Sequence, residues 1–403
     1  TTTLNYQTAE DQLTIEPMSI SGEALRVAGS LHAARATTAP QVVAELDVNA
    51  SAQQTASWLA PWLGPGVSLQ GIGPTHVRAE GVLPYGRAGK STSLPSSAST
   101  TSARRVGAAP APLPDWTQQW QLQANTSVQG ANLYGLPLGP MNAAVAWNEG
   151  QLTFDPIETA AGGGSIRLAP RLIVMPAPAM LTLPAGEVAS RVEISQHVSE
   201  EMLKYAAPVL AGAARAEGTF SATIDRLQLP LEDRRRIEMG GKLVIHRLNV
   251  TPGPMLQQLE GVIQQIDALT LGRTGGPAPN SRMTLTALDK TVEFRATEGR
   301  VYHRGLEFLL DDVPISSHGS VGFDDTLAIV IEVPIQEKWI RRQRALQSLA
   351  GQKLEIPIRG TFDRPELDPQ AVANMSRLLL EGAAQQYIGD EIQRALDKLF
   401  KPR

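Results

Sequence analysis

Acidic side chains are the first residues of this chain that could perform chemistry. Asp311-Asp312 and Asp324-Asp325 are adjacent carboxylate pairs, a residue type used in acid–base catalysis and calcium binding. Adjacent residues on a strand point to opposite faces, and the second pair has the composition of a turn, so turn residues are the favoured interpretation of both pairs. A catalytic carboxylate can have its partner far away in the chain, so a carbohydrate-active enzyme on a β scaffold stays an alternative.

Histidine and cysteine could supply metal ligands or nucleophiles. No cysteine is present, which excludes disulfides, thiolate zinc sites and cysteine nucleophiles, and is compatible with an oxidising compartment. No pair of histidines has metal-ligand spacing; they are His32, His76, His197, His246, His303 and His318. We therefore predict no metal, no cofactor and no catalytic residue, that is, a protein that is not an enzyme.

Two glycine-containing stretches resemble nucleotide-binding loops only in part. Gly89-Lys-Ser91 ends like a phosphate loop, but Pro84 stands where the first glycine of that motif belongs. Gly71-Ile-Gly73 lacks the third glycine of the dinucleotide fingerprint. The formal net charge of −4 also argues against a nucleic-acid partner.

Strands are the elements that must position any site. Between residues 282 and 335 apolar residues alternate with polar ones, which places one apolar face on successive strands. Val292 and Phe294 share such a face, and the longest stripe is formed by Leu327, Ile329, Ile331, Val333 and Ile335. Short turns are predicted at Leu288–Lys290, Glu298–Arg300 and Phe323–Thr326.

The organisation of the chain follows from its composition. Residues 1–85 read as strands around one helix, and 86–114, rich in Ser, Ala, Pro and Gly, as a disordered linker. Residues 115–368 read as the main antiparallel region with inserted helices, and 369–403 as an amphipathic helix. The fold class we expect is mainly β, an elongated curved antiparallel sheet with short capping helices.

The termini and hydropathy bear on location. No run approaches the ~18 apolar residues of a membrane-spanning helix, and no signal peptide is visible. The chain opens at Thr1 without Met. We expect it to be a fragment whose natural N-terminus lies upstream.

Two stretches resemble a known family. VAWNEGQLTFDPIETAAGGGSIRL is similar to the recurring unit of AsmA-like envelope proteins, which include the TamB-type modules. LEIPIRGTFDRPELDP followed by an amphipathic helix resembles their C-terminal ends. The likeness covers 141–400 and more loosely 1–85, while the family's N-terminal membrane anchor and the 86–114 insertion depart from the pattern.

This resemblance implies a β-groove that is open along one side and apolar inside. It implies a periplasmic protein, anchored to the inner membrane by a segment absent here, that conducts phospholipids or other acyl lipids between the inner and outer membranes. Outer-membrane barrel or inner-membrane proteins would be its partners. The groove lining we expect is Val292, Phe294, Leu327, Ile329, Ile331 and Val333.

The alternation of apolar residues leaves other readings open. A packed sandwich core needs the same single apolar face as an open groove. A structural scaffold for outer-membrane protein assembly, acting through a sheet edge or the terminal helix, is the second hypothesis for function.

Overall fold

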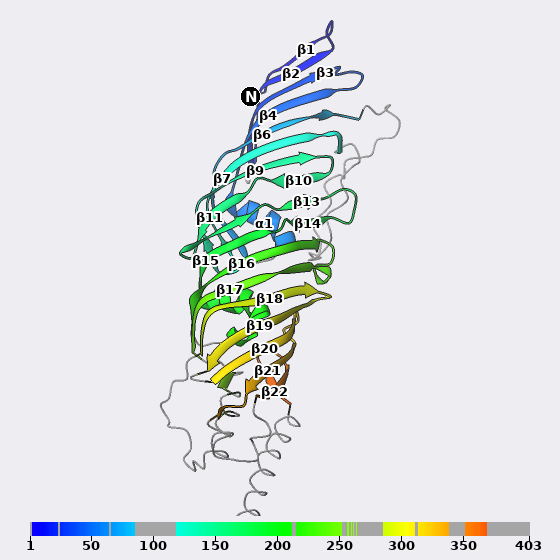
Figure 1. Ribbon diagram of the computed structural model, residues 1–403. Helices are drawn as coiled ribbons and strands as arrows, with labels where there is room; N and C mark the ends of the chain where they lie inside the picture. Colours follow the sequence, from blue (N-terminus) through cyan, green and yellow to red (C-terminus); the bar gives the residue numbers. More distant parts are fainter. Residues whose placement is uncertain are drawn as a thin grey trace, which may run out of the picture. The chain divides into compact units, whose positions relative to one another are not determined.

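The computed structural model describes residues 2–22, 25–63, 66–84, 118–211, 215–251, 256–257, 259, 261, 263, 285–310, 313–337 and 351–368. The described part is mainly β, with few and short helices (Figure 1). Neighbouring strands pair in antiparallel fashion, as in the pairs β3–β4 and β20–β21. The predicted fold class, a mainly antiparallel β protein with short helices, is confirmed.

The chain divides into two compact units, which we call unit 1 (Thr1–Val188 and Asp225–Ile237) and unit 2 (Ala189–Ile224 and Glu238–Arg403). Among the described residues of unit 1 the one α-helix is α1 (Ala52–Leu63), in agreement with the single helix expected within residues 1–85, and it packs against β5. Its strands are β1 (Leu4–Gln7), β2 (Gln12–Ser21), β3 (Leu25–Ala34), β4 (Gln41–Ala50), β5 (Val67–Ile72), β6 (Thr75–Val82), β7 (Gln121–Leu133), β8 (Leu136–Leu138), β9 (Met141–Asn148), β10 (Gln151–Phe154), β11 (Ile157–Ala161), β12 (Gly164–Leu168), β13 (Arg171–Ile173) and β14 (Met180–Leu183).

Strands β15 (Gly186–Ile194) and β16 (Arg215–Pro230) contribute residues to both units. The remaining strands belong to unit 2: β17 (Glu238–Thr251), β18 (Leu285–Thr297), β19 (Arg300–Leu310), β20 (Val313–Gly322), β21 (Leu327–Pro334), β22 (Lys353–Gly360) and β23 (Pro365–Leu367). A 3₁₀ turn, Arg234–Arg236, belongs to unit 1.

The long strand β7 divides the pairing in unit 1. Its first half pairs with β6 and β9, from Leu122 to Val128 on the β9 side. Its second half pairs with β5 and β8 instead. From β9 the pairing continues through β10, β13 and β14 to the end of β16.

Tight hairpin turns hold this register. Glu149 and Gly150 join β9 to β10 with φ of 48° and 80°, and Gly162 and Gly163 join β11 to β12 with φ of 45° and 73°. Two consecutive residues of positive φ match the right-handed twist of the flanking strands, and glycine adopts that conformation at little cost.

The predicted turn at Leu288–Lys290 is wrong. β18 runs through these residues and continues to Thr297. Asp289 takes a left-handed φ of 46°, and the register of β18 against β19 shifts between Thr286 and Glu293, the stretch that contains Asp289. A single left-handed residue inside a continuous strand is typical of a β-bulge. The turns predicted at Glu298–Arg300 and Phe323–Thr326 are confirmed.

A helical segment in unit 2 runs from Gln196 to Leu210. It consists of α2 (Gln196–Val198), a π-helical turn (Ser199–Leu203), α3 (Lys204–Ala206) and a 3₁₀ turn (Pro208–Leu210). Ser195 caps its start, because its side chain accepts a hydrogen bond from the Val198 N–H at 3.3 Å. Of residues 252–269, the structure describes 256, 257, 259, 261 and 263, which are helical, as expected for an inserted helix in the main region. The predicted linker 86–114 and the predicted terminal helix 369–403 lie outside the described residues.

Candidate functional site

An uninterrupted row of apolar side chains crosses unit 1 from strand to strand. Each member stands directly opposite the next in the hydrogen-bonded register, so all share one face of the sheet. We call this set the apolar row: Ile15, Leu31, Ala44, Ala79, Leu122, Trp147, Leu152, Leu172, Leu181 and Leu229. With about 4.8 Å between neighbouring strands, it extends for about 40 Å.

A second row runs beside the apolar row on the same face. Its members are Met18, Gly29, Leu46, Val77, Ala124, Val145 and Phe154. No charged side chain occurs in either row. Together the two rows make a band without charge that is two residues wide from β2 to β10, and the apolar row alone continues it through β13 and β14 to β16.

The large side chains of the apolar row are only partly buried. Ala44 and Ala79 are 6% and 8% exposed, but Ile15, Leu122 and Leu152 keep more of their surface accessible. The same holds for Leu31, Trp147, Leu172, Leu181 and Leu229. Apolar surface left in contact with water costs free energy that a ligand or partner can recover, so this face is a candidate binding surface.

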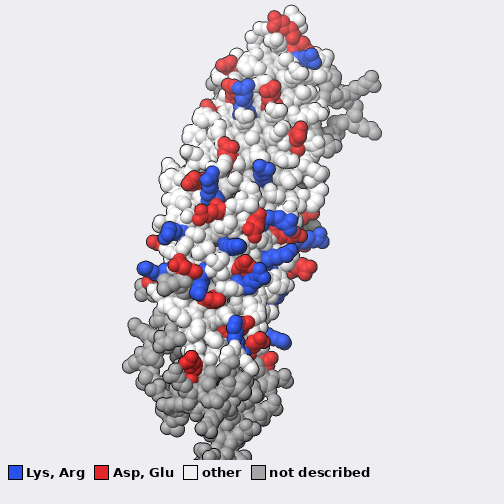
Figure 2. Space-filling view, in the orientation of Figure 1, with Lys and Arg blue, Asp and Glu red and all other residues white. Residues whose placement is uncertain are grey.

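The opposite face of the same strands is polar. The residues that alternate with the apolar row form a parallel row of Ser30, Glu45, Arg78, Gln123, Ala146, Thr153, Arg171, Thr182 and Gln228. Figure 2 shows Lys and Arg interspersed with Asp and Glu on the face in view. A mixed and charged face is typical of the side of a sheet that stays in water.

Unit 2 contains the residues predicted to line a groove. Val292 and Phe294 lie on β18, and Leu327, Ile329, Ile331 and Val333 on β21. The register links Phe294 through His303 and Gly319 to Ile329, so the two strands present their residues on one face. The structure thus brings the predicted residues together on a common surface.

Within unit 2 that surface is packed. Except for Phe294, which is partly exposed, the predicted residues are at most 4% exposed. Helix α3 contacts β18, β19 and β20, and the helical segment contributes the buried side chains of Val198, Leu203, Val209 and Leu210. Leu256, Leu259 and Ile263 are also at most 2% exposed. Side chains of the chain itself therefore fill the interior of unit 2.

An ion pair links Lys204 of the helical segment to Asp325 in the β20–β21 turn. Lys204 Nζ lies 3.0 Å from Asp325 Oδ1, 5.1 Å from the Tyr205 ring centroid and 5.6 Å from that of Phe362. Burial lowers the pKa of Lys204, but the hydrogen bond to Asp325 and its charge outweigh this, so that the pKa is raised. Tyr205 also packs edge-on against Phe323, with ring centroids 5.9 Å apart.

His303 is the buried titratable side chain among the described residues of unit 2. It is 3% exposed, and its Nε2 lies 3.0 Å from Ser317 Oγ. Desolvation by burial, reinforced by the charge of His318, lowers the pKa of His303 from 6.5 to about 4. Nδ1 of His303 has no hydrogen-bond partner among the described residues. His303 is therefore a neutral side chain of the core at pH 7.

The carboxylate pairs singled out in the sequence have structural partners where they are described. Asp324 accepts hydrogen bonds from the backbone N–H and the side chain of Thr326, at 3.2 and 2.7 Å, which lower its pKa. Asp325 pairs with Lys204. Asp311-Asp312 and Gly89-Lys-Ser91 lie outside the described residues. The described residues hold no group of three or more His, Cys, Asp and Glu that could bind a metal.

Sequence reasoning placed the groove in unit 2, where alternation is strongest, and missed the apolar row of unit 1. That row uses Ala, Ile and Trp beside Leu, so each strand of unit 1 carries a weaker alternation than β21. The available signal was the pairing of leucines on neighbouring strands, such as Leu152 on β10 and Leu172 on β13, which becomes visible only once the register is known.

Comparison with known proteins gives no relatives: no family model, no curated protein and no solved structure matches the chain. Within the described residues, no helix is long and apolar enough to cross a membrane.

Proposed function

We propose that the protein binds acyl lipids along the apolar row of unit 1 and passes them between the two membranes of a cell envelope without making or breaking bonds. The observation that carries this proposal is a band free of charge whose large side chains remain partly exposed. A lipid tail needs only apolar contact along its length, and each buried CH₂ contributes about 0.8 kcal/mol. The resemblance to AsmA-like proteins supports the periplasmic setting.

The packed interior of unit 2 assigns the two units different roles in this proposal. Acyl chains contact the apolar row in unit 1. Val292, Leu327, Ile329, Ile331 and Val333 are at most 4% exposed and form the core that holds unit 2 together. Phe294, which keeps some exposure, is the member of the predicted lining most accessible to a ligand.

Lipid binding is tested on the purified full chain. Lipids are extracted and identified by mass spectrometry, and binding of a fluorescent fatty acid is titrated. Leu152→Glu places a charge in the apolar row, whereas Gln151→Glu adds the same charge at the neighbouring, exposed position. We expect co-purified phospholipid in the wild type, weakened fatty-acid binding in Leu152→Glu and wild-type binding in Gln151→Glu.

Two results would contradict the proposal. If repeated preparations contain no lipid and also fail to bind the fatty acid, lipid is ruled out as the ligand. If the two variants bind the fatty acid equally well, the apolar row is ruled out as the binding site. Circular dichroism of each variant keeps loss of binding separate from loss of fold.

The alternatives from the sequence receive less support. The terminal helix 369–403, on which the scaffold hypothesis partly depends, lies outside the described residues. For a glycoside hydrolase, two carboxyl groups must flank one substrate. Two surface pockets among the described residues contain a single carboxylate each, Glu80 in one and Glu307 in the other.

A further inference from the structure

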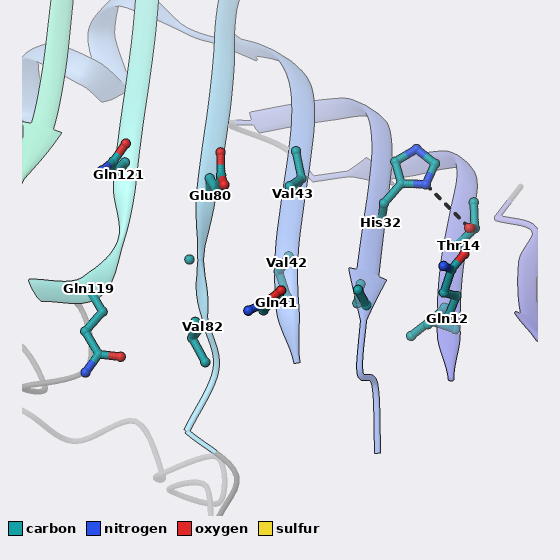
Figure 3. Close-up of a pocket in the computed structure, with 14 residues that line it drawn as sticks. Gln12, Thr14, His32, Gln41, Val42, Val43, Glu80, Val82, Gln119 and Gln121 are labelled. Atoms are coloured by element: carbon teal, nitrogen blue, oxygen red, sulfur yellow. Dashed lines mark hydrogen bonds between the residues drawn. The ribbon is translucent and has the colours of Figure 1, made fainter. Parts of the chain in front are cut away.

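A shallow trough of about 520 Å³ lies on the polar face of unit 1. It crosses β2, β3, β4, β6 and the start of β7, and Figure 3 shows the side chains that these strands contribute. One cross-strand row consists of Thr14, His32, Val43, Glu80 and Gln121, and the next of Gln12, Ala34, Gln41 and Val82, with Gln119 preceding β7. We call this surface the polar trough.

Amide side chains dominate the chemistry of the polar trough. Gln12, Gln41, Gln119 and Gln121 each offer two N–H donors and a carbonyl acceptor. Within the described part of the chain none of them forms a side-chain hydrogen bond, so their donors and acceptors are open to a ligand. His32 takes part only in a long contact, 3.4 Å from Nδ1 to Thr14 Oγ1.

Glu80 differs from the other carboxylates on this face. Glu45 pairs across the strands with Arg78 at 3.7 Å, and Asp47 pairs with His76. Glu80 stands opposite Val43 and Gln121 and forms no ion pair with a described residue. Lys and Arg are absent from the residues that line the trough. An anionic ligand would therefore find no countercharge, whereas a neutral ligand rich in hydrogen-bonding groups would find both donors and acceptors.

We propose that the polar trough binds a neutral glycan chain. The glutamine amides bind hydroxyl and acetamido groups, the Glu80 carboxylate accepts hydrogen bonds from neighbouring hydroxyls, and Ala34, Val43 and Val82 contact the C–H faces of the sugars. Equivalent positions repeat every strand, about 4.8 Å, which is close to the advance per sugar of an extended β-linked polysaccharide. The single carboxylate of the trough supports binding without hydrolysis, which needs a second one. This site lies on the opposite face from the apolar row and does not depend on lipid binding.

The test uses the full chain and a β-1,4-linked tetramer of N-acetylglucosamine as the probe, with maltotetraose for comparison. Binding is detected by saturation-transfer NMR and titrated by calorimetry. The double variant Gln41→Val, Gln121→Val removes two amides from the trough, and Gln123→Val removes one two residues further along the same strand, outside the trough. Glu80→Gln keeps the shape and removes the charge.

We expect the tetramer to bind the wild type, with affinity about tenfold lower in the double variant, from the loss of two hydrogen bonds of about 0.7 kcal/mol each, and severalfold lower in Glu80→Gln. Gln123→Val should bind like the wild type, and fatty-acid binding should be unchanged in all of these variants. Absence of binding of both oligosaccharides at millimolar concentration would overturn the proposal. So would equal weakening by Gln123→Val and by the double variant.

Discussion

Because the two units differ in packing, truncating a large apolar side chain to alanine should lower the free energy of unfolding by different amounts in the two units. Ile329 of unit 2 is 1% exposed, and Leu152 of unit 1 is partly exposed. Replacing either by alanine removes three carbon atoms, worth about 2.4 kcal/mol of transfer free energy for a fully buried side chain. Ile329→Ala also leaves a cavity that the packed interior cannot close, which raises the expected loss of unfolding free energy to about 3–4 kcal/mol.

Leu152→Ala should cost much less. Part of its side chain already meets water, so the transfer free energy is smaller, and water or a ligand occupies the vacated space, so the cavity contribution is small. We expect a loss of about 1–1.5 kcal/mol. The difference between the two variants, about 2 kcal/mol, measures how much more tightly unit 2 is filled than unit 1.

The assay is urea unfolding of the full chain, followed by circular dichroism, with hydrogen exchange and mass spectrometry to assign each transition to a unit. A saturating fatty acid provides a second measurement. It should raise the stability of unit 1 in the wild type, because a ligand that binds only the folded state stabilises it, and less so in Leu152→Ala. A cost for Leu152→Ala as large as that for Ile329→Ala would refute the reasoning, because it would mean that both interiors are filled.

Three further predictions concern single side chains. The free energy of unfolding should fall as the pH is lowered from about 7 to 4, because His303 takes up a proton near pH 6.5 in the unfolded chain and only near pH 4 in the folded one. The loss amounts to up to about 3 kcal/mol. His303→Gln should flatten this part of the pH profile, as measured by urea unfolding. Lys204→Met should lower the free energy of unfolding by about 1–2 kcal/mol and speed hydrogen exchange in the helical segment 196–210. Lys204→Arg should keep most of the protection from exchange. Unchanged exchange in Lys204→Met would show that the contact with Asp325 does not hold the segment in place. Gly29→Ala should destabilise unit 1 by more than about 2 kcal/mol, because the new Cβ would lie 2.0 Å from the Glu45 carbonyl oxygen. Gly186 has a similar φ and nothing within 4 Å of the position that a Cβ would take, so Gly186→Ala should destabilise the unit less. Equal melting temperatures for the two variants would contradict the close approach at Gly29.

Local chemistry made much of the fold predictable from the sequence. Alternation identified β21 and its apolar face, and polar residues marked the turns at Glu298–Arg300 and Phe323–Thr326, because each feature depends on residues close together in the chain. Asp289 was misread, since an Asp between two apolar runs fits a bulge as well as a turn.

Burial was beyond reach of the same reasoning. Ile329 and Leu152 both belong to apolar faces, and only their distant neighbours decide which of them is covered. The polar trough likewise depends on Gln12, Gln41 and Gln121 meeting across strands that lie many residues apart in the sequence. Neither surface follows from periodicity along a single strand.

The two-residue turns of unit 1 impose a parity rule on the length of its strands. Inserting or deleting one residue within β10 would exchange the outward and inward positions of every later residue in that strand, so that Thr153 and not Leu152 would face the apolar side. Changes of an even number of residues, or changes confined to the turns, preserve the alternation. Natural variants of this chain should therefore vary in length at their hairpin ends and between strands, and keep the residue count between one apolar contact and the next even or unchanged.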